Sequence, residues 1–111
     1  SVQMRDYQRE VFSVLLLDSK HQLLSYHELF QGSINETSVH PREVVKLALG
    51  KNAAAVIVAH NHPSGVADPS SSDIAITHKL RSALGLIDIP LLDHFIIGRG
   101  EITSLAEQGK M

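Results

Sequence analysis

The sequence predicts one α/β domain in which helices pack against a mixed central β-sheet. Three observations support this fold class. Short apolar runs rich in β-branched residues, which are typical of buried strands, occupy residues 11–17, 53–59 and 91–97. Two stretches with apolar residues at helical spacing lie between these runs, and a glycine follows each of them. Strands and helices therefore alternate through the middle of the chain, as expected for a sheet covered by helices.

The first half of the chain predicts a β-hairpin followed by a helix. Residues 11–17 are apolar at nearly every position, which indicates a strand buried on both faces. Residues 18–21 are polar and form the turn, and a second strand covers residues 22–26, with the apolar pair at 29–30 as a candidate extension. A helix then begins at Pro41, a residue suited to the first helical turn, and ends at Gly50.

The second half predicts a central strand, a helix and two final strands. Residues 53–59 form the central strand, and a loop rich in Pro, Ser and Asp follows it. The core-facing residues of the next helix recur at helical spacing and are Ile76, Leu80, Ala83 and Leu84. Gly85 ends this helix, and residues 91–97 and 101–105 pair around a glycine-containing turn.

Composition limits the class of protein. The chain has 111 residues, of which 43% are hydrophobic, enough for the core of one domain. It has no cysteine, which excludes disulfides, cysteine-ligated zinc and a cysteine nucleophile. No apolar run approaches the roughly 20 residues that span a bilayer, and the N-terminus lacks the apolar core of a signal peptide. We expect a cytoplasmic protein without a membrane partner, and we expect residues 1–111 to form the C-terminal domain of a longer chain.

A group of three residues predicts a metal site. His60 and His62 follow the buried strand at 53–59, and residues two apart in an extended chain point to the same side. Asp73 comes eleven residues after His62, in the first turn of the next helix, and the loop between them is long enough to fold back. Two imidazoles, one carboxylate and an open fourth position are typical of catalytic zinc. We expect one Zn²⁺ per chain at this site.

Each part of this group also has a simpler interpretation. Two histidines at a strand end can be ordinary surface residues. Ser70 and Asp73 have the spacing of a helix capping box, which stabilises a helix N-terminus without any metal. A carboxylate in the first turn can cap a helix and bind a metal at once. The occurrence of both motifs on one strand–loop–helix unit favours the metal site.

These motifs resemble a known family of proteins and, more closely, one branch of that family. The pattern His60-x-His62-Pro63 followed by Ser70-x-x-Asp73 resembles the JAMM signature of the MPN+ metalloproteases, including its spacing. Four longer segments resemble the RadC branch, and they lie at residues 39–43, 59–65, 69–73 and 92–94. The resemblance spans residues 9–105 and implies a single MPN (JAMM) domain with the cytidine-deaminase-like fold.

The resemblance also implies an activity and site residues. JAMM domains are zinc metallopeptidases or isopeptidases that cleave an amide bond with a metal-activated water. It implies that His60, His62 and Asp73 hold the zinc and that Ser70 donates a hydrogen bond to the developing oxyanion. A catalytic glutamate is expected at the start of the strand beside the metal strand. Glu10 matches that place best.

Two other acidic residues are also candidates for the catalytic glutamate, and one residue departs from the family pattern. Glu28, after the hairpin turn, and Glu43, in the first turn of a helix, are the second and third candidates for the catalytic glutamate. Asn61 stands where most JAMM peptidases have Ser or Thr between the histidines. Because a residue between two inward-facing ligands points away from the metal, we expect the zinc site to tolerate it. His94, at the start of an apolar strand, is expected to have a structural role.

The expected partner is a peptide or protein substrate. The net charge of −2 gives no support for nucleic acid binding by this segment. The alternatives are a DNA-repair-associated or nuclease-like protein and a non-catalytic MPN scaffold. Nuclease sites often use two metal ions, whereas this chain offers ligands for one. A scaffold would be free to lose its ligands, and the complete set argues against that alternative.

Overall fold

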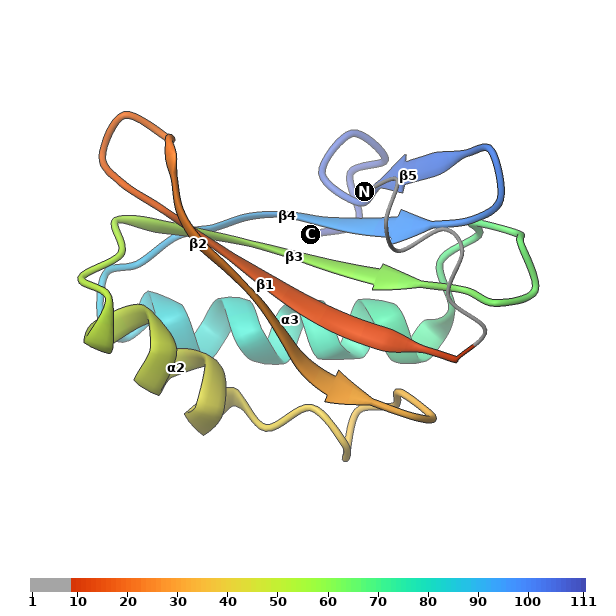
Figure 1. The fold of residues 1–111 in the computed structure, drawn as a ribbon, viewed down its shortest axis with the longest axis horizontal. Helices are drawn as coiled ribbons and strands as arrows, with labels where there is room; N and C mark the ends of the chain where they lie inside the picture. The colour runs from red at the N-terminus through yellow and green to blue at the C-terminus, as the bar shows by residue number, and fades with distance from the viewer. Residues whose placement is uncertain (1–8) are drawn as a thin grey trace.

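The computed structural model describes residues 9–111, which form a five-stranded sheet and two α-helices (Figure 1). In chain order the elements are β1 (Val11–Leu17), β2 (Leu23–Gln31), α2 (Pro41–Gly50), β3 (Ala55–Asn61), α3 (Ser71–Gly85), β4 (Leu91–Ile97) and β5 (Ile102–Ser104). The predicted α/β fold class is confirmed. Residues 1–8 of the predicted domain lie outside the described residues.

The strand order places the two predicted site strands side by side. The order across the sheet is β2-β1-β3-β4-β5. β3 and β4 run parallel, and the other neighbouring pairs are antiparallel, so the sheet is mixed as predicted. In the register of β1 against β3, Phe12 lies opposite His60. The start of β1, where Glu10 stands, therefore lies beside the end of β3, where the histidine pair stands.

Some strand boundaries differ from the sequence prediction. β2 is one continuous strand that runs to Gln31, five residues beyond the predicted core of that strand. β3 begins two residues later than predicted because the amide of Ala53 still donates to the carbonyl of Ala48, which keeps Ala53 in the turn that follows α2. β3 also extends further, so that His60 lies within the strand. β5 has only three residues, fewer than predicted.

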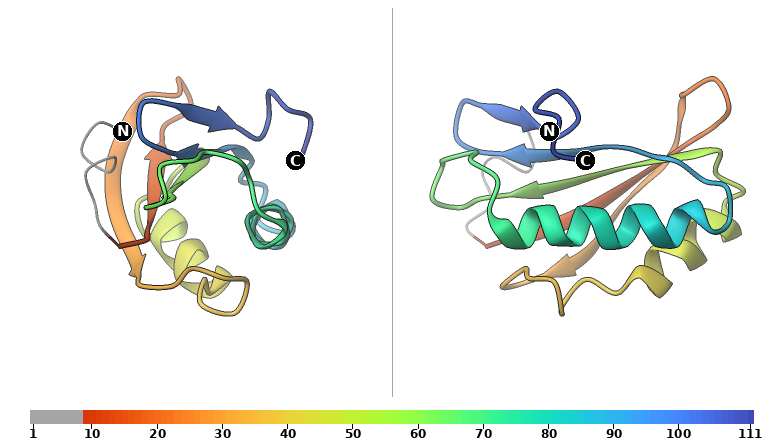
Figure 2. Two further views of the ribbon diagram at one scale, coloured as in Figure 1. Left: turned by 90° about the vertical axis from the view of Figure 1, so that its right-hand side faces the viewer. Right: turned by 180° about the vertical axis from the view of Figure 1, so that it is seen from behind.

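Both helices cover the same face of the sheet, and the main core lies between them and the strands (Figures 1 and 2). This core includes Val14 and Leu16 of β1, Val56 and Val58 of β3, Val44 and Ala48 of α2, and Ile76, Leu80 and Leu84 of α3. A smaller cluster of Val11, Ala59 and Ile97 lies on the other face. The alternating residues of β1 thus contribute to both clusters, which confirms its burial on both faces.

The two helices of the described residues are 10 and 15 residues long. Within residues 9–111, neither of them has the length and apolar character needed to cross a membrane.

Candidate metal centre

Three predicted ligands meet at the end of β3. His60 occupies the next-to-last position of the strand and His62 follows its end, while Asp73 stands in the first turn of α3. One potential ligand atom from each residue lies within 4.8 Å of the others, and no other such group of three occurs within residues 9–111. The side chains of His60 and Asp73 are each 1% exposed and that of His62 is 16% exposed. The group therefore opens toward solvent on the side of His62.

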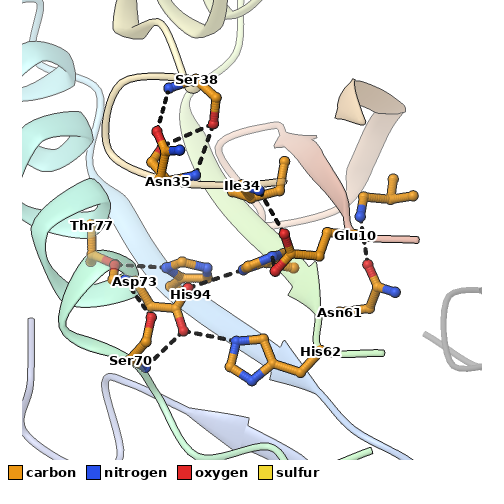
Figure 3. A network of polar contacts seen from close by, with 12 residues as sticks. Glu10, Ile34, Asn35, Ser38, Asn61, His62, Ser70, Asp73, Thr77 and His94 are labelled. Atoms are coloured by element: carbon orange, nitrogen blue, oxygen red, sulfur yellow. Dashed lines mark hydrogen bonds and ion pairs between the residues drawn. The ribbon is translucent and has the colours of Figure 1, made fainter. Parts of the chain in front are cut away.

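Asp73 is the hub of this group (Figure 3). Its Oδ1 accepts from Nδ1 of His60 at 3.0 Å, and its Oδ2 accepts from Nε2 of His62 at 2.9 Å. The same Oδ2 accepts from the backbone amide of Ser70 at 2.8 Å, which completes the predicted capping box. Burial alone would raise the pKa of the Asp73 carboxyl, but hydrogen bonds from both histidines and from Ser70 hold it well below its usual range. The carboxyl is therefore an anion throughout the physiological pH range.

The ring orientation of His62 is fixed by a second hydrogen bond. Its Nδ1 donates to the carbonyl of Val66 at 3.0 Å, which leaves Nε2 directed at Asp73. The hydrogen bond with Asp73 is the largest cause of the raised pKa of His62. Both ring nitrogens donate in this arrangement. Binding of a metal at Nε2 would release that proton while the hydrogen bond to Val66 keeps the ring oriented.

His60 presents an unsatisfied nitrogen to the predicted catalytic glutamate. Nδ1 of His60 is hydrogen-bonded to the carboxylate of Asp73, which leaves Nε2 directed away from it. This Nε2 is buried and has no hydrogen-bond partner within residues 9–111. Oε1 of Glu10 lies 3.5 Å from it. A buried ring nitrogen without a hydrogen-bond partner among the described residues, beside a carboxylate oxygen, is an arrangement that a bound cation would satisfy.

The loop after His62 is held against the turn between β4 and β5. The amide of His62 donates to the carbonyl of Ile97, and the amide of Arg99 donates to the carbonyl of Gly65. The two segments approach so closely that a Cβ at Gly98 would lie 2.5 Å from the Gly65 carbonyl oxygen. The loop held in this way carries the carbonyl of Val66, which accepts from Nδ1 of His62.

Beneath the ligands, Thr77 and its contact with His94 were missed by the sequence interpretation, which expected only a structural role for His94. The hydroxyl of Thr77 donates to the carbonyl of Asp73 at 2.7 Å, and its oxygen lies 2.6 Å from Nδ1 of His94. Because the hydroxyl proton is already used, Nδ1 of His94 is the donor in the second contact. Burial lowers the pKa of His94 to about 4, and its Nε2 has no partner among the described residues. The spacing of Thr77 four residues after Asp73 was the available signal.

The remaining predicted residues differ in their distance from the ligands. Ser70 is exposed at the N-terminus of α3, where its Oγ accepts from the amide of Asp73. Glu28 accepts a hydrogen bond from Tyr26 on β2, and Glu43 forms an exposed ion pair with Lys46 on α2. Glu10 alone among the three acidic candidates contacts one of the predicted ligands in the contacts of residues 9–111.

These residues fit a single metal ion. The donor set consists of two imidazoles and one carboxylate, which suits zinc, and both imidazoles are oriented by hydrogen bonds. The orphaned Nε2 of His60 gives an independent reason for a cation at this position.

Comparison with known proteins gives one family. A family model described as the RadC-like JAB domain matches residues 1–110. A UPF0758 protein of Cellvibrio japonicus is 61% identical over 107 residues, which cover 96% of this chain and 48% of that protein. UPF0758 proteins of Halorhodospira halophila and Vibrio cholerae are 59% and 58% identical, each over 96% of this chain and 47% of their own length.

The chain thus spans about half the length of the curated relatives that it matches. The match covers both histidines, Asp73 and Glu10, together with the strands and helix that position them. It agrees with the resemblance inferred from the sequence motifs. The chain belongs to the family of RadC-like JAB domains.

Proposed function

We propose that this chain is a zinc-dependent hydrolase that cleaves an amide bond with a metal-activated water, as a metallopeptidase or isopeptidase does. One observation carries the proposal. Three oriented ligands at the end of β3 lie beside a carboxylate from the start of β1, and the Nε2 of His60 that faces this carboxylate lacks a partner within residues 9–111. A metal site with an adjacent acid–base group is the minimum that such a hydrolysis requires.

His60, His62 and Asp73 would hold the zinc. Bound there, zinc would lower the pKa of a coordinated water toward 7 and polarise the carbonyl of the substrate. Glu10 is suited to take up the proton of the water and pass it to the leaving amine. Its Oε2 accepts from the amide of Ile34 at 2.6 Å, so its Oε1 stays directed at the metal site.

Ser70 is suited to hold the developing oxyanion. Its Oγ accepts from the amide of Asp73, an arrangement that fixes the oxygen while leaving the hydroxyl proton available at the exposed rim of the site. Loss of an oxyanion donor typically costs about 2.7–4 kcal/mol of barrier. A peptide or protein substrate would approach from this side, where His62 is partly exposed and the Glu10 side chain is 29% exposed.

Metal content tests the ligand assignment directly. We expect the purified and reconstituted protein to hold about one zinc ion per chain and His62→Ala to hold almost none, because two protein ligands retain zinc poorly. His78→Ala is the matched control, since His78 is exposed on α3 and lies outside the ligand group. Negligible zinc in the wild type, or equal zinc in His62→Ala, would contradict the site.

Hydrolysis of a library of peptides and isopeptides by the zinc-loaded protein tests the reaction. We expect Glu10→Gln to retain zinc while its rate falls by about 10²–10⁴-fold, the usual contribution of general acid–base catalysis. Glu43→Gln is the control, because Glu43 pairs with Lys46 on α2 and should be dispensable. A Glu10→Gln variant with wild-type rates would remove Glu10 from the mechanism.

A further inference from the structure

Asn61 connects the metal strand to the backbone around Glu10. Its side chain is 2% exposed, at the last position of β3 between the two histidines. The Oδ1 of Asn61 accepts from the amide of Val11 at 2.6 Å (Figure 3). The Nδ2 of Asn61 donates to the carbonyl of Arg9 at 2.9 Å. One side chain thus binds the residue before Glu10 and the residue after it.

The side chain takes the place of a missing stretch of sheet. The paired register of β1 and β3 ends with Phe12 opposite His60. The Val11 amide and the Arg9 carbonyl lie beyond this last pair, so they need a partner of another kind. An amide side chain carries its donor and its acceptor on two separate atoms, whereas the single oxygen of a hydroxyl would have to reach both backbone groups. Asn is therefore chemically suited to hold both backbone groups.

The other contacts of Glu10 depend on where this backbone lies. Its carbonyl accepts from the amide of Gly32 at 3.0 Å, and its Oε2 accepts from the amide of Ile34 at 2.6 Å. With these groups held, the remaining carboxylate oxygen lies 3.5 Å from Nε2 of His60. A shift of the Glu10 backbone would move this oxygen relative to the metal ligands.

We propose that Asn61 is a positioning residue that clamps the peptide groups on both sides of Glu10 and thereby directs its carboxylate at the metal site. The importance of this position for catalysis rests on the proposed function, in which Glu10 moves the proton. The clamp itself is a property of the metal-free protein and is testable without any substrate. Asn61 sits between two ligands on β3, but both of its hydrogen bonds are made to the segment that carries the acid–base group.

Amide hydrogen exchange in the zinc-free protein, measured by NMR, reports the position of the Glu10 carboxylate. The amide of Ile34 is bonded to this carboxylate and makes no contact with Asn61 among those described. In Asn61→Ala we expect exchange at Ile34 to become faster on the order of tenfold, the effect of losing about one hydrogen bond. Glu10→Ala gives the rate for a fully lost contact. The zinc content of Asn61→Ala should equal that of the wild type.

A core variant separates positioning from general loss of stability. Val58→Ala lies on the same strand, is fully buried and faces the core between sheet and helices. It should lower stability without a selective change at Ile34. If Asn61→Ala does not fold, Asn61→Asp replaces it, because the acid keeps the shape but cannot donate to the Arg9 carbonyl.

Faster exchange at Val11 with unchanged exchange at Ile34, relative to Val58→Ala, would overturn the proposal and leave Asn61 as a strand-end hydrogen bond only. The proposed function fails by a different result. A wild-type protein that binds no zinc would contradict that function and leave the exchange measurement at Ile34 intact.

Discussion

The two halves of β3 bury their side chains equally well, but the first half buries apolar side chains in the core and the second half buries polar ones whose hydrogen bonding within residues 9–111 is incomplete. On the face toward the helices, Val56 and Val58 are fully buried in the apolar core. Two positions further along the same face, His60 is 1% exposed, and on the neighbouring strand His94 is fully buried. Within residues 9–111, each of these two histidines has a ring nitrogen without a hydrogen-bond partner. The first half is an ordinary core, whereas the second half is polar and incompletely satisfied.

The difference teaches where stability and chemistry reside in this domain. Apolar burial stabilises the fold by roughly 25 cal/mol per Å². A buried polar atom without a partner costs about 1–3 kcal/mol, and proteins retain such atoms mainly where a ligand or a reaction needs them. Substitutions in the apolar half should therefore lower the free energy of unfolding without affecting metal binding. Substitutions in the polar half should affect metal binding more than stability.

The largest effect on stability is expected from a cavity in the main core, against which the apolar half of β3 packs. Leu80 of α3 is 1% exposed in the main core. Leu80→Ala should lower the free energy of unfolding by about 2–5 kcal/mol, measured by urea denaturation, because it removes apolar contacts and leaves a void. Zinc stoichiometry of the folded variant should stay near one. Loss of zinc from a folded Leu80→Ala protein would show that the two halves are coupled rather than separate.

A glycine far from the ligands in sequence should give the next largest effect, this time on zinc affinity. A Cβ at Gly98 would collide with the backbone of the loop that orients His62, at 2.5 Å from the Gly65 carbonyl. Because this loop carries the carbonyl that fixes the His62 ring, Gly98→Ala should weaken zinc binding about 10–100-fold, measured by competition with a chelator. Gly50→Ala is the control, since a Cβ there meets nothing within 4 Å. Equal zinc affinities of Gly98→Ala and the wild type would mean that the loop does not determine the orientation of the His62 ring.

The ligand group illustrates what the sequence could predict and why. A strand with the spacing of His60 and His62, followed by a capping box at Asp73, encodes its geometry locally. These positions follow from the periods of strand and helix. The family resemblance implied that the strand after Glu10 lies beside the metal strand, and the pairing of β1 with β3 confirms this.

The supporting contacts could not be read in the same way. Asn61 contacts residues fifty and fifty-two positions away, and Thr77 meets His94 on another element. Such partners depend on register and packing, which no local pattern contains. The end of β5 was overestimated for a related reason. The amide of Leu105 still donates to the carbonyl of His94, but the next amide, that of Ala106, donates to the carboxylate of Asp93, and the pairing with β4 ends there.

A pH-dependent stability is expected from the buried His94 in the polar half. Burial lowers its pKa from the ordinary 6.5 to about 4 in the folded protein. Between these values the unfolded chain takes up a proton that the folded protein does not, so the free energy of unfolding falls as the pH falls, by up to about 1.4 kcal/mol per pH unit. His62 and Asp73 do not add to this slope. The raised pKa of His62 acts above pH 6.5, and the lowered pKa of Asp73 acts below its ordinary 3.8.

Urea denaturation with EDTA present, at pH 4.5 and at pH 6.5, measures this dependence. His94→Gln should show a smaller loss of stability between the two pH values than the wild type. The exposed His78 supplies the control, and His78→Gln should keep the wild-type dependence. An equal dependence in His94→Gln would assign the acid sensitivity to other groups.

The smallest change in folded structure is expected from removal of the metal, which tests whether the polar half is a catalytic or a structural site. A structural zinc site unfolds without its ion, because the ion supplies the folding energy. Here the main core is built from apolar residues of the sheet and both helices, and Asp73 caps α3 and holds both histidines by hydrogen bonds of its own. We therefore expect EDTA to leave the far-ultraviolet circular dichroism at 25 °C unchanged. The free energy of unfolding should fall only by the linkage to zinc binding, which is about 2.7 kcal/mol when zinc is at a hundredfold above its Kd. The thermal midpoint should fall accordingly. His62→Ala should show no such shift on EDTA addition, since it has little zinc to lose. Unfolding of the wild type by EDTA at this temperature would make the zinc site part of the folding core, and the contrast between the two halves of β3 would then be wrong.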